Sequence, residues 1–100
     1  MTEPAFNAFP GYSSLLSLAR RVLWFKEPED ALRNMDQLVA YTLTIGTVDD
    51  VHVLRSELGD ERLRASLQRA PAGIFDPRSW TYWHLMLDLP PDTPLPRRSL

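Results

Sequence analysis

The positions of proline and glycine constrain the fold of this chain more than any other feature. They interrupt the sequence at Pro28, Gly46, Gly59 and the stretch 71–77, and four more prolines follow Leu89. Proline biases the residue before it away from helical geometry, and glycine commonly ends a helix. The chain is therefore a series of short segments.

Within these segments, apolar residues recur at steps of three and four, which is the period of one buried helix face. The pattern predicts helices from residue 13 up to Pro28, and over 28–46, 47–58, 60–70 and 79–88. The sequence contains no pair of strand patterns, no internal repeat and no heptad array. We therefore expect an all-α fold, a single small domain of four to five short helices with a Pro-rich C-terminal tail.

Capping residues mark several of the expected helix ends. Ser13 or Ser14 is a suitable N-cap for the first helix. Gly46 is expected to end the second helix as a left-handed C-cap. Thr47 and Asp50 have the spacing of a capping box, in a weaker form because aspartate replaces the usual glutamate.

The segment 79–88 has two competing interpretations. Its Trp, Thr and Tyr residues are common in strands. The three-residue spacing of its tryptophans and the Asp76-Pro77 dipeptide before it instead favour a helix. We predict a helix here.

The same breaks define the domain organisation. We expect an irregular N-terminal arm over 1–12, a helical domain over 13–89, and an extended, polyproline-like tail over 90–100. One hundred residues correspond to one domain. A chain of this size can bury one core without disulfide or metal staples, which suits a sequence that has no cysteine.

Composition argues against most catalytic and metal chemistry. The absence of cysteine excludes disulfides, thiolate zinc sites and thiol nucleophiles. The two histidines, His52 and His84, occur outside any HExxH pattern, and no glycine-rich phosphate loop is present. We interpret both histidines as structural or solvent-exposed, and expect a protein that is not an enzyme and needs no cofactor.

A nucleic-acid-binding role is the alternative hypothesis. The helices 47–58 and 60–70 are joined at Gly59, as in a helix-turn-helix, and the second carries the candidate DNA contacts Arg62, Arg64 and Arg69. However, two acids begin that helix, where this motif approaches bases, and the net charge is −2. An ordinary helical hairpin is the favoured interpretation.

No segment of the sequence indicates a membrane. The longest uncharged run in the interior, 37–48, has twelve residues, whereas a spanning helix needs about 20. The first residues lack the basic and apolar regions of a signal peptide. We therefore expect a cytoplasmic protein.

The last helical segment carries the candidate partner-binding residues. Arg78, Trp80, Tyr82, Trp83 and Met86 lie within nine positions, and aromatic residues with arginine dominate interface hot spots. A short helix with apolar residues on opposing faces cannot bury them all against one small core. We expect the two tryptophans to enter the core, and the tyrosine and methionine to face a partner.

Three stretches of the chain have a recognisable sequence. The first runs from Ala19 to Leu32, and the second from Tyr41 to Arg55. The most specific is Arg-Ser-Trp-x-Tyr-Trp at 78–83, and a Pro-rich end with Arg97 and Arg98 follows it. Together they resemble a family of small bacterial proteins that are commonly encoded beside nucleotidyltransferase toxins of the AbiEii type.

The resemblance implies an antitoxin or accessory partner of such a toxin. The chain has neither the Gly-Ser turn nor the Asp-x-Asp pair of a nucleotidyltransferase, so a binding role is consistent. The implied mechanism is steric: the last helix and the Pro-rich tail, with Arg97 and Arg98, would cover the cleft of the toxin. The sequence leaves a homodimer open.

Overall fold

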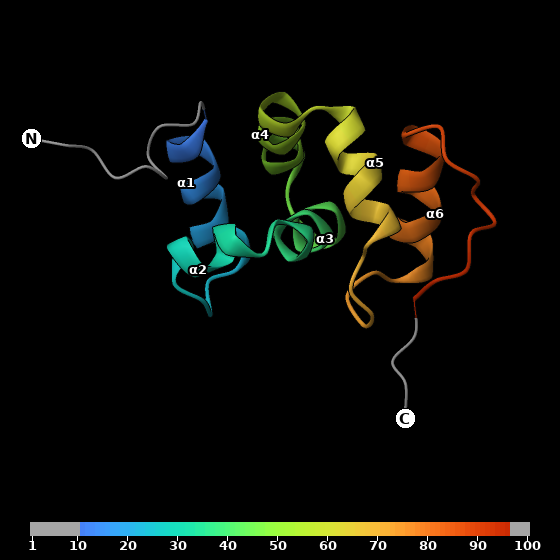
Figure 1. Ribbon diagram of the computed structural model, residues 1–100, viewed down its shortest axis with the longest axis horizontal. Coiled ribbons are helices and arrows are strands. Elements are labelled where there is room, and N and C mark those ends of the chain that lie inside the picture. Colours follow the sequence, from blue (N-terminus) through green and yellow to red (C-terminus); the bar gives the residue numbers. More distant parts are fainter. Residues whose placement is uncertain (1–10, 97–100) are drawn as a thin grey trace, which may run out of the picture.

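The computed structural model describes residues 11–96, and these form six α-helices and no strand (Figure 1). In chain order the helices are α1 (Tyr12–Val22), α2 (Pro28–Arg33), α3 (Met35–Ile45), α4 (Val48–Leu58), α5 (Asp60–Gln68) and α6 (Pro77–Met86). The predicted all-α fold of one small domain is confirmed. Most of the expected N-terminal arm lies outside the described residues.

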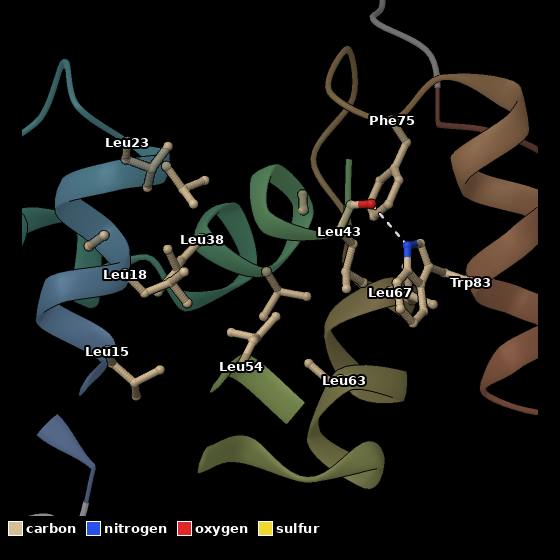
Figure 2. Packing of buried hydrophobic residues seen from close by; sticks show 14 of the residues in the cluster. Leu15, Leu18, Leu23, Leu38, Leu43, Leu54, Leu63, Leu67, Phe75 and Trp83 are labelled. Atoms are coloured by element: carbon tan, nitrogen blue, oxygen red, sulfur yellow. Dashed lines mark hydrogen bonds between the residues drawn. The ribbon is translucent and has the colours of Figure 1, made fainter. Parts of the chain in front are cut away.

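Helix α3 is the centre of the domain, because it contacts each of the other five helices. Figure 1 shows α1 and α2 on one side of it, and α5 and α6 on the other. The core around it is rich in leucine, with contributions from every helix and from the loop before α6 (Figure 2). Leu38 of α3, Leu54 of α4 and Leu63 of α5 are completely buried.

The segment 28–46 contains two helices where we predicted one, which is why the fold has six helices. Asn34 leaves helical geometry, with φ −119° and ψ 77°, and its side-chain oxygen accepts a hydrogen bond from the backbone N–H of Gln37. Asparagine is a preferred N-cap residue. The apolar stripe continues on both sides of the break, so periodicity alone could not reveal it.

The first helix also differs from the prediction at both ends. It starts at Tyr12 after Gly11, which adopts a positive φ of 81°, so neither Ser13 nor Ser14 is the N-cap. It ends at Val22, well before Pro28, because the chain turns at Leu23, where the N–H of Lys26 donates to the Leu23 carbonyl. Leu23 is thereby completely buried.

The cap predictions had mixed outcomes. The capping box of Thr47 and Asp50 is confirmed, and so is the helix that starts at Asp76 and Pro77. Gly46 was wrongly expected to be left-handed, since its φ is −69°. Glycine is required there for space, because a Cβ would lie 2.5 Å from the Thr42 carbonyl oxygen.

The described part of the Pro-rich tail, 90–96, is not simply extended. It turns at Pro90, whose carbonyl accepts a hydrogen bond from the Thr93 backbone N–H, and it folds back beside α6 (Figure 1). The indole N–H of Trp80 donates to the Thr93 carbonyl oxygen over 2.9 Å. This bond attaches the tail to the last helix.

Candidate functional site

In the described chain, a surface groove with a volume of about 520 Å³ lies between α4 and α6. We call it the α4–α6 groove. One wall is α4, the other is α6, and the end of α3 with the following turn closes the groove between them. Its lining residues are Leu43, Gly46, Thr47, Val48, Val51, His52, Arg55, Arg78, Ser79, Tyr82, Trp83 and Met86.

Each wall is one face of a helix whose start is fixed by its own sequence. In α4, the capping box starts the helix at Val48, so that the residues four and seven positions later point the same way. In α6, the Asp76 carboxylate accepts a hydrogen bond from the Ser79 N–H, with Pro77 in the first turn. The caps therefore set which side chains enter the groove.

The floor of the groove is held by Trp83. Its side chain is only 7% exposed, and its indole N–H donates to the backbone carbonyl of Leu43 over 2.9 Å (Figure 2). This bond joins residues forty positions apart and attaches α6 to the end of α3. The same carbonyl lies in the last turn of α3, where intrahelical partners are lacking.

Trp80 lies on the opposite side of α6, away from the groove. It is 4% exposed and packs edge-on against Phe75, with 5.1 Å between ring centroids. Its ring also lies beside His84, at 4.3 Å. Both tryptophans of this helix are thus in the core, as expected, and neither is an exposed partner-binding residue.

Tyr82 and Met86 are exposed on the groove side of α6, at 52% and 44%. The Tyr82 ring stands perpendicular to Trp83, with centroids 5.0 Å apart. Facing them, Val48 is 86% exposed at the start of α4. The groove therefore joins exposed apolar side chains that are more than thirty positions apart in the sequence.

Two arginines supply the fixed charges in the lining. Arg55 forms a bidentate pair with Asp60, at 3.0 and 2.8 Å, and lies 6.0 Å from the centre of the Trp83 ring. The hydrogen bond to Asp60 raises the pKa of Arg55, so the guanidinium remains charged. Arg78, in the first turn of α6, makes no ion pair within residues 11–96.

Two of the three arginines of α5 are bonded to other parts of the chain, unlike Arg78. Arg64 donates from Nε to the Leu87 carbonyl over 2.7 Å, and Arg69 forms a bidentate pair with Asp36. The hydrogen bond from Arg69 lowers the pKa of Asp36. Only Arg62, of the three candidate DNA contacts, has an exposed side chain with no such bond in the described chain. The structure does not assemble a free basic face on α5.

The two histidines lie in different places. His52 is exposed on the α4 wall of the groove, whereas His84 is 3% exposed, with Nδ1 2.7 Å from the Trp80 carbonyl oxygen. Among the described residues, no cluster of three His, Cys, Asp or Glu side chains could hold a metal ion. Arg97 and Arg98, the remaining candidates, lie outside the described residues.

Sequence reasoning identified the α6 wall of the groove and missed the α4 wall. The sequence pattern places Val51 on a buried helix face with Leu54 and Leu58, and it does not single out Val48, which lies directly after the N-cap.

In the described part of the chain, no helix has the length and apolar character to cross a membrane.

Comparison with known proteins finds no relative of this chain. Neither a family model, nor a curated protein, nor a solved structure matches the chain.

Proposed function

We propose that this chain is a protein–protein interaction module that binds its partner through the α4–α6 groove. The observation that carries the proposal is the convergence of Val48, Tyr82 and Met86, all exposed, on one groove lined by arginine. Tyrosine and arginine are enriched among the residues that dominate binding energy. Exposed apolar side chains gathered in one place are typical of an interaction site.

The exposed apolar side chains of the groove can make a substantial contribution to binding. Full burial of one large apolar side chain contributes about 1.5–3 kcal/mol. Three such side chains, partly covered by a partner, would supply several kcal/mol before the cost of association. The floor beneath them is rigid, since Trp83 is fixed to the Leu43 carbonyl, so little side-chain freedom would be lost there.

We further propose that the partner is a nucleotidyltransferase toxin and that this chain is its antitoxin. The support is the resemblance described above, whose most specific residues, 78–83, include Arg78 and Tyr82 at the groove. Inhibition would be steric, with the exposed side of α6 covering the toxin's active-site cleft. The described part of the tail, 90–96, packs against the other side of α6, and residues 90–100 would add a second contact area there.

The DNA-binding alternative receives less support from the arrangement of charges. Arg64 and Arg69 are bonded within the chain, and Asp60 and Glu61 occupy the first turn of α5. Carboxylates at that position would meet DNA phosphates with like charge. We therefore retain the interaction module as the proposed function.

Co-purification with the product of the adjacent gene tests the proposal. The tagged protein should retain the nucleotidyltransferase and suppress its activity. The double variant with Tyr82→Ala and Met86→Ala should bind at least about 30-fold more weakly, because truncated hot-spot residues cost about 2 kcal/mol or more. Deletion of 90–100 should weaken binding to a smaller extent.

Trp24→Ala is the matched control, since Trp24 is 77% exposed but lies outside the groove. It should bind like the wild type. Undiminished binding by both the double variant and the deletion would remove the proposed interface. Retention of operator DNA by the isolated protein, with a steep salt dependence, would instead support the alternative.

A further inference from the structure

Both walls of the α4–α6 groove present side chains at helical spacing. Val48, His52 and Arg55 line one wall at positions i, i+4 and i+7, and Arg78, Tyr82 and Met86 line the other at i, i+4 and i+8. At a rise of 1.5 Å per residue, each row extends for roughly 10–12 Å, or two helical turns. A groove between two helices commonly receives a third helix lengthwise.

The interior of the groove is an apolar surface on which apolar side chains of a partner can pack. Leu43 and Trp83 form its floor and are buried, whereas Tyr82, Met86 and Val48 stand at the edges and are exposed. An apolar side chain that entered between these edges would contact carbon and aromatic surface on three sides. An occupant therefore needs apolar residues along one face, spaced like those of an amphipathic helix.

The charge of the groove opposes the charge of the whole chain. The chain carries a net charge of −2, yet the fixed charges in the lining are Arg55 and Arg78, and none of the described aspartates or glutamates belongs to it. Arg55 is held in place by Asp60, which also compensates its charge. Arg78 is exposed and has no ion pair in the described chain. A carboxylate does lie nearby, since the pKa of Asp76 is lowered by hydrogen bonding from Ser79 and also by the charge of Arg78. Because Asp76 does not line the groove, Arg78 is the cation that a partner can reach there.

We propose that the groove binds an acidic amphipathic helix of the partner protein. Apolar residues of that helix would lie between Met86 and Val48, and a carboxylate about two turns along the same helix would pair with Arg78. The proposal rests on the protein-binding function proposed above, but it does not depend on the partner being a nucleotidyltransferase. Charge complementarity of this kind selects the partner and its orientation.

A phage-displayed library of helical peptides, panned on the full-length protein, tests this inference. The selected peptides should share an apolar stripe and carry a net negative charge. As a synthetic peptide, the best of them should bind Arg78→Glu about 10-fold or more weakly than the wild type, and its affinity for the wild type should fall as salt is raised. Arg78 occupies the first turn of α6, where glutamate is favourable, so the variant should fold.

The matched control is Arg20→Glu, a reversal of an exposed arginine on α1 that does not line the groove. It should bind the selected peptide within about twofold of the wild type, as expected for a charge outside the contact. Met86→Ala provides a second variant that leaves all charges in place, and it should also weaken binding.

Three results would overturn the inference: enrichment of neutral or basic peptides, equal binding to Arg78→Glu and the wild type, or no enrichment at all. Failure of the adjacent gene product to co-purify, together with selection of acidic peptides, would contradict only the identity of the toxin. Co-purification together with basic peptides would contradict only the proposed occupant. The two proposals can therefore fail separately.

Discussion

Within residues 11–96, exposed aromatic side chains occur in two regions, and these differ in how they are built. Trp24 and Phe25 lie in the turn after α1, where the surrounding hollow is formed almost entirely by one stretch of chain, 20–28. Tyr82 lies in the α4–α6 groove, whose walls come from three helices. Trp24 is the more exposed of the two, at 77% against 52% for Tyr82.

The surroundings of the two regions also differ in charge. The turn at 20–28 contains both signs, with Arg20, Lys26 and Glu27, and Lys26 donates to the side chain of Gln37. The fixed charges of the groove are of one sign. The comparison teaches that exposure by itself does not indicate an interaction site; a concave arrangement with a consistent chemistry does.

The largest expected effect is on the free energy of unfolding, and it distinguishes the buried Trp83 from the exposed Trp24. Trp83→Ala should lower the free energy of unfolding by about 3–5 kcal/mol, because it opens a cavity and removes the bond to the Leu43 carbonyl. Trp24→Ala should change it by no more than about 0.5 kcal/mol. Urea denaturation followed by circular dichroism measures both. Similar losses in the two variants would show that the turn at 20–28 supports the core.

A pair of exposed β-branched residues sharpens the comparison for binding. Val48→Ser should weaken partner binding about 10-fold, since it removes roughly 1.5 kcal/mol of apolar burial. Ile45→Ser should not, because Ile45 is also exposed but does not line the groove. Calorimetric titration with the co-purified partner gives both affinities. Equal losses would move the interface from the groove to the junction of α3 and α4.

A third test contrasts a bonded arginine with an unbonded one. Arg64→Ala should lower the free energy of unfolding by about 1 kcal/mol, because the Leu87 carbonyl loses its donor. Arg78→Ala should leave stability unchanged within about 0.5 kcal/mol while weakening binding. Thermal unfolding of the two variants side by side measures the difference. A stability loss in Arg78→Ala would mean that this arginine is also a structural residue.

The smallest expected effect is the pH dependence of stability that comes from Asp50, the carboxylate of the α4 capping box. Burial raises the pKa of Asp50, but hydrogen bonds from Thr47 and Arg21 outweigh it, and the net pKa is below the ordinary value of 3.8. The carboxylate therefore stabilises the fold fully above that value, and the stabilisation is lost as pH falls through the lower folded pKa.

Asp50→Asn should accordingly flatten the acid limb of the stability profile. The measurement is the urea midpoint as a function of pH, in the wild type and the variant. The same acid slope in both proteins would contradict the assignment. Asp50 does not line the groove itself, but its capping box with Thr47 fixes the start of the α4 wall, so this variant is a test of stability and not a control for binding.

Local sequence signals predicted most of the helices and several of their ends. Pro77 with Asp76, and Thr47 with Asp50, specify helix starts through contacts within one turn, so the sequence alone reveals them. The break at Asn34 escaped prediction, because the helices on either side of it continue one apolar stripe. Likewise, Gly46 is needed for space beside the Thr42 carbonyl, and not for a positive φ.

For the candidate site too, the sequence predicted what depends on local spacing and missed what depends on packing. The burial of Trp83 and exposure of Tyr82 follow from their neighbouring positions on one helix, as predicted. The second wall could not be predicted, since no pattern within α4 places Val48 opposite Met86. The bonds that occupy Arg64 and Arg69 join residues twenty-three and thirty-three positions apart, and they too arise only when the helices pack.

The sequence by itself determined that this chain is all-helical, that α6 carries apolar residues on two sides, and that no cysteine chemistry is available. These properties depend on residue types and on spacing within a few turns. Only the tertiary structure decided which arginines are already bonded and which apolar side chains share a groove. Both depend on how α3 positions α4 and α6 around it, because contacts between distant segments are set by packing and not by local spacing.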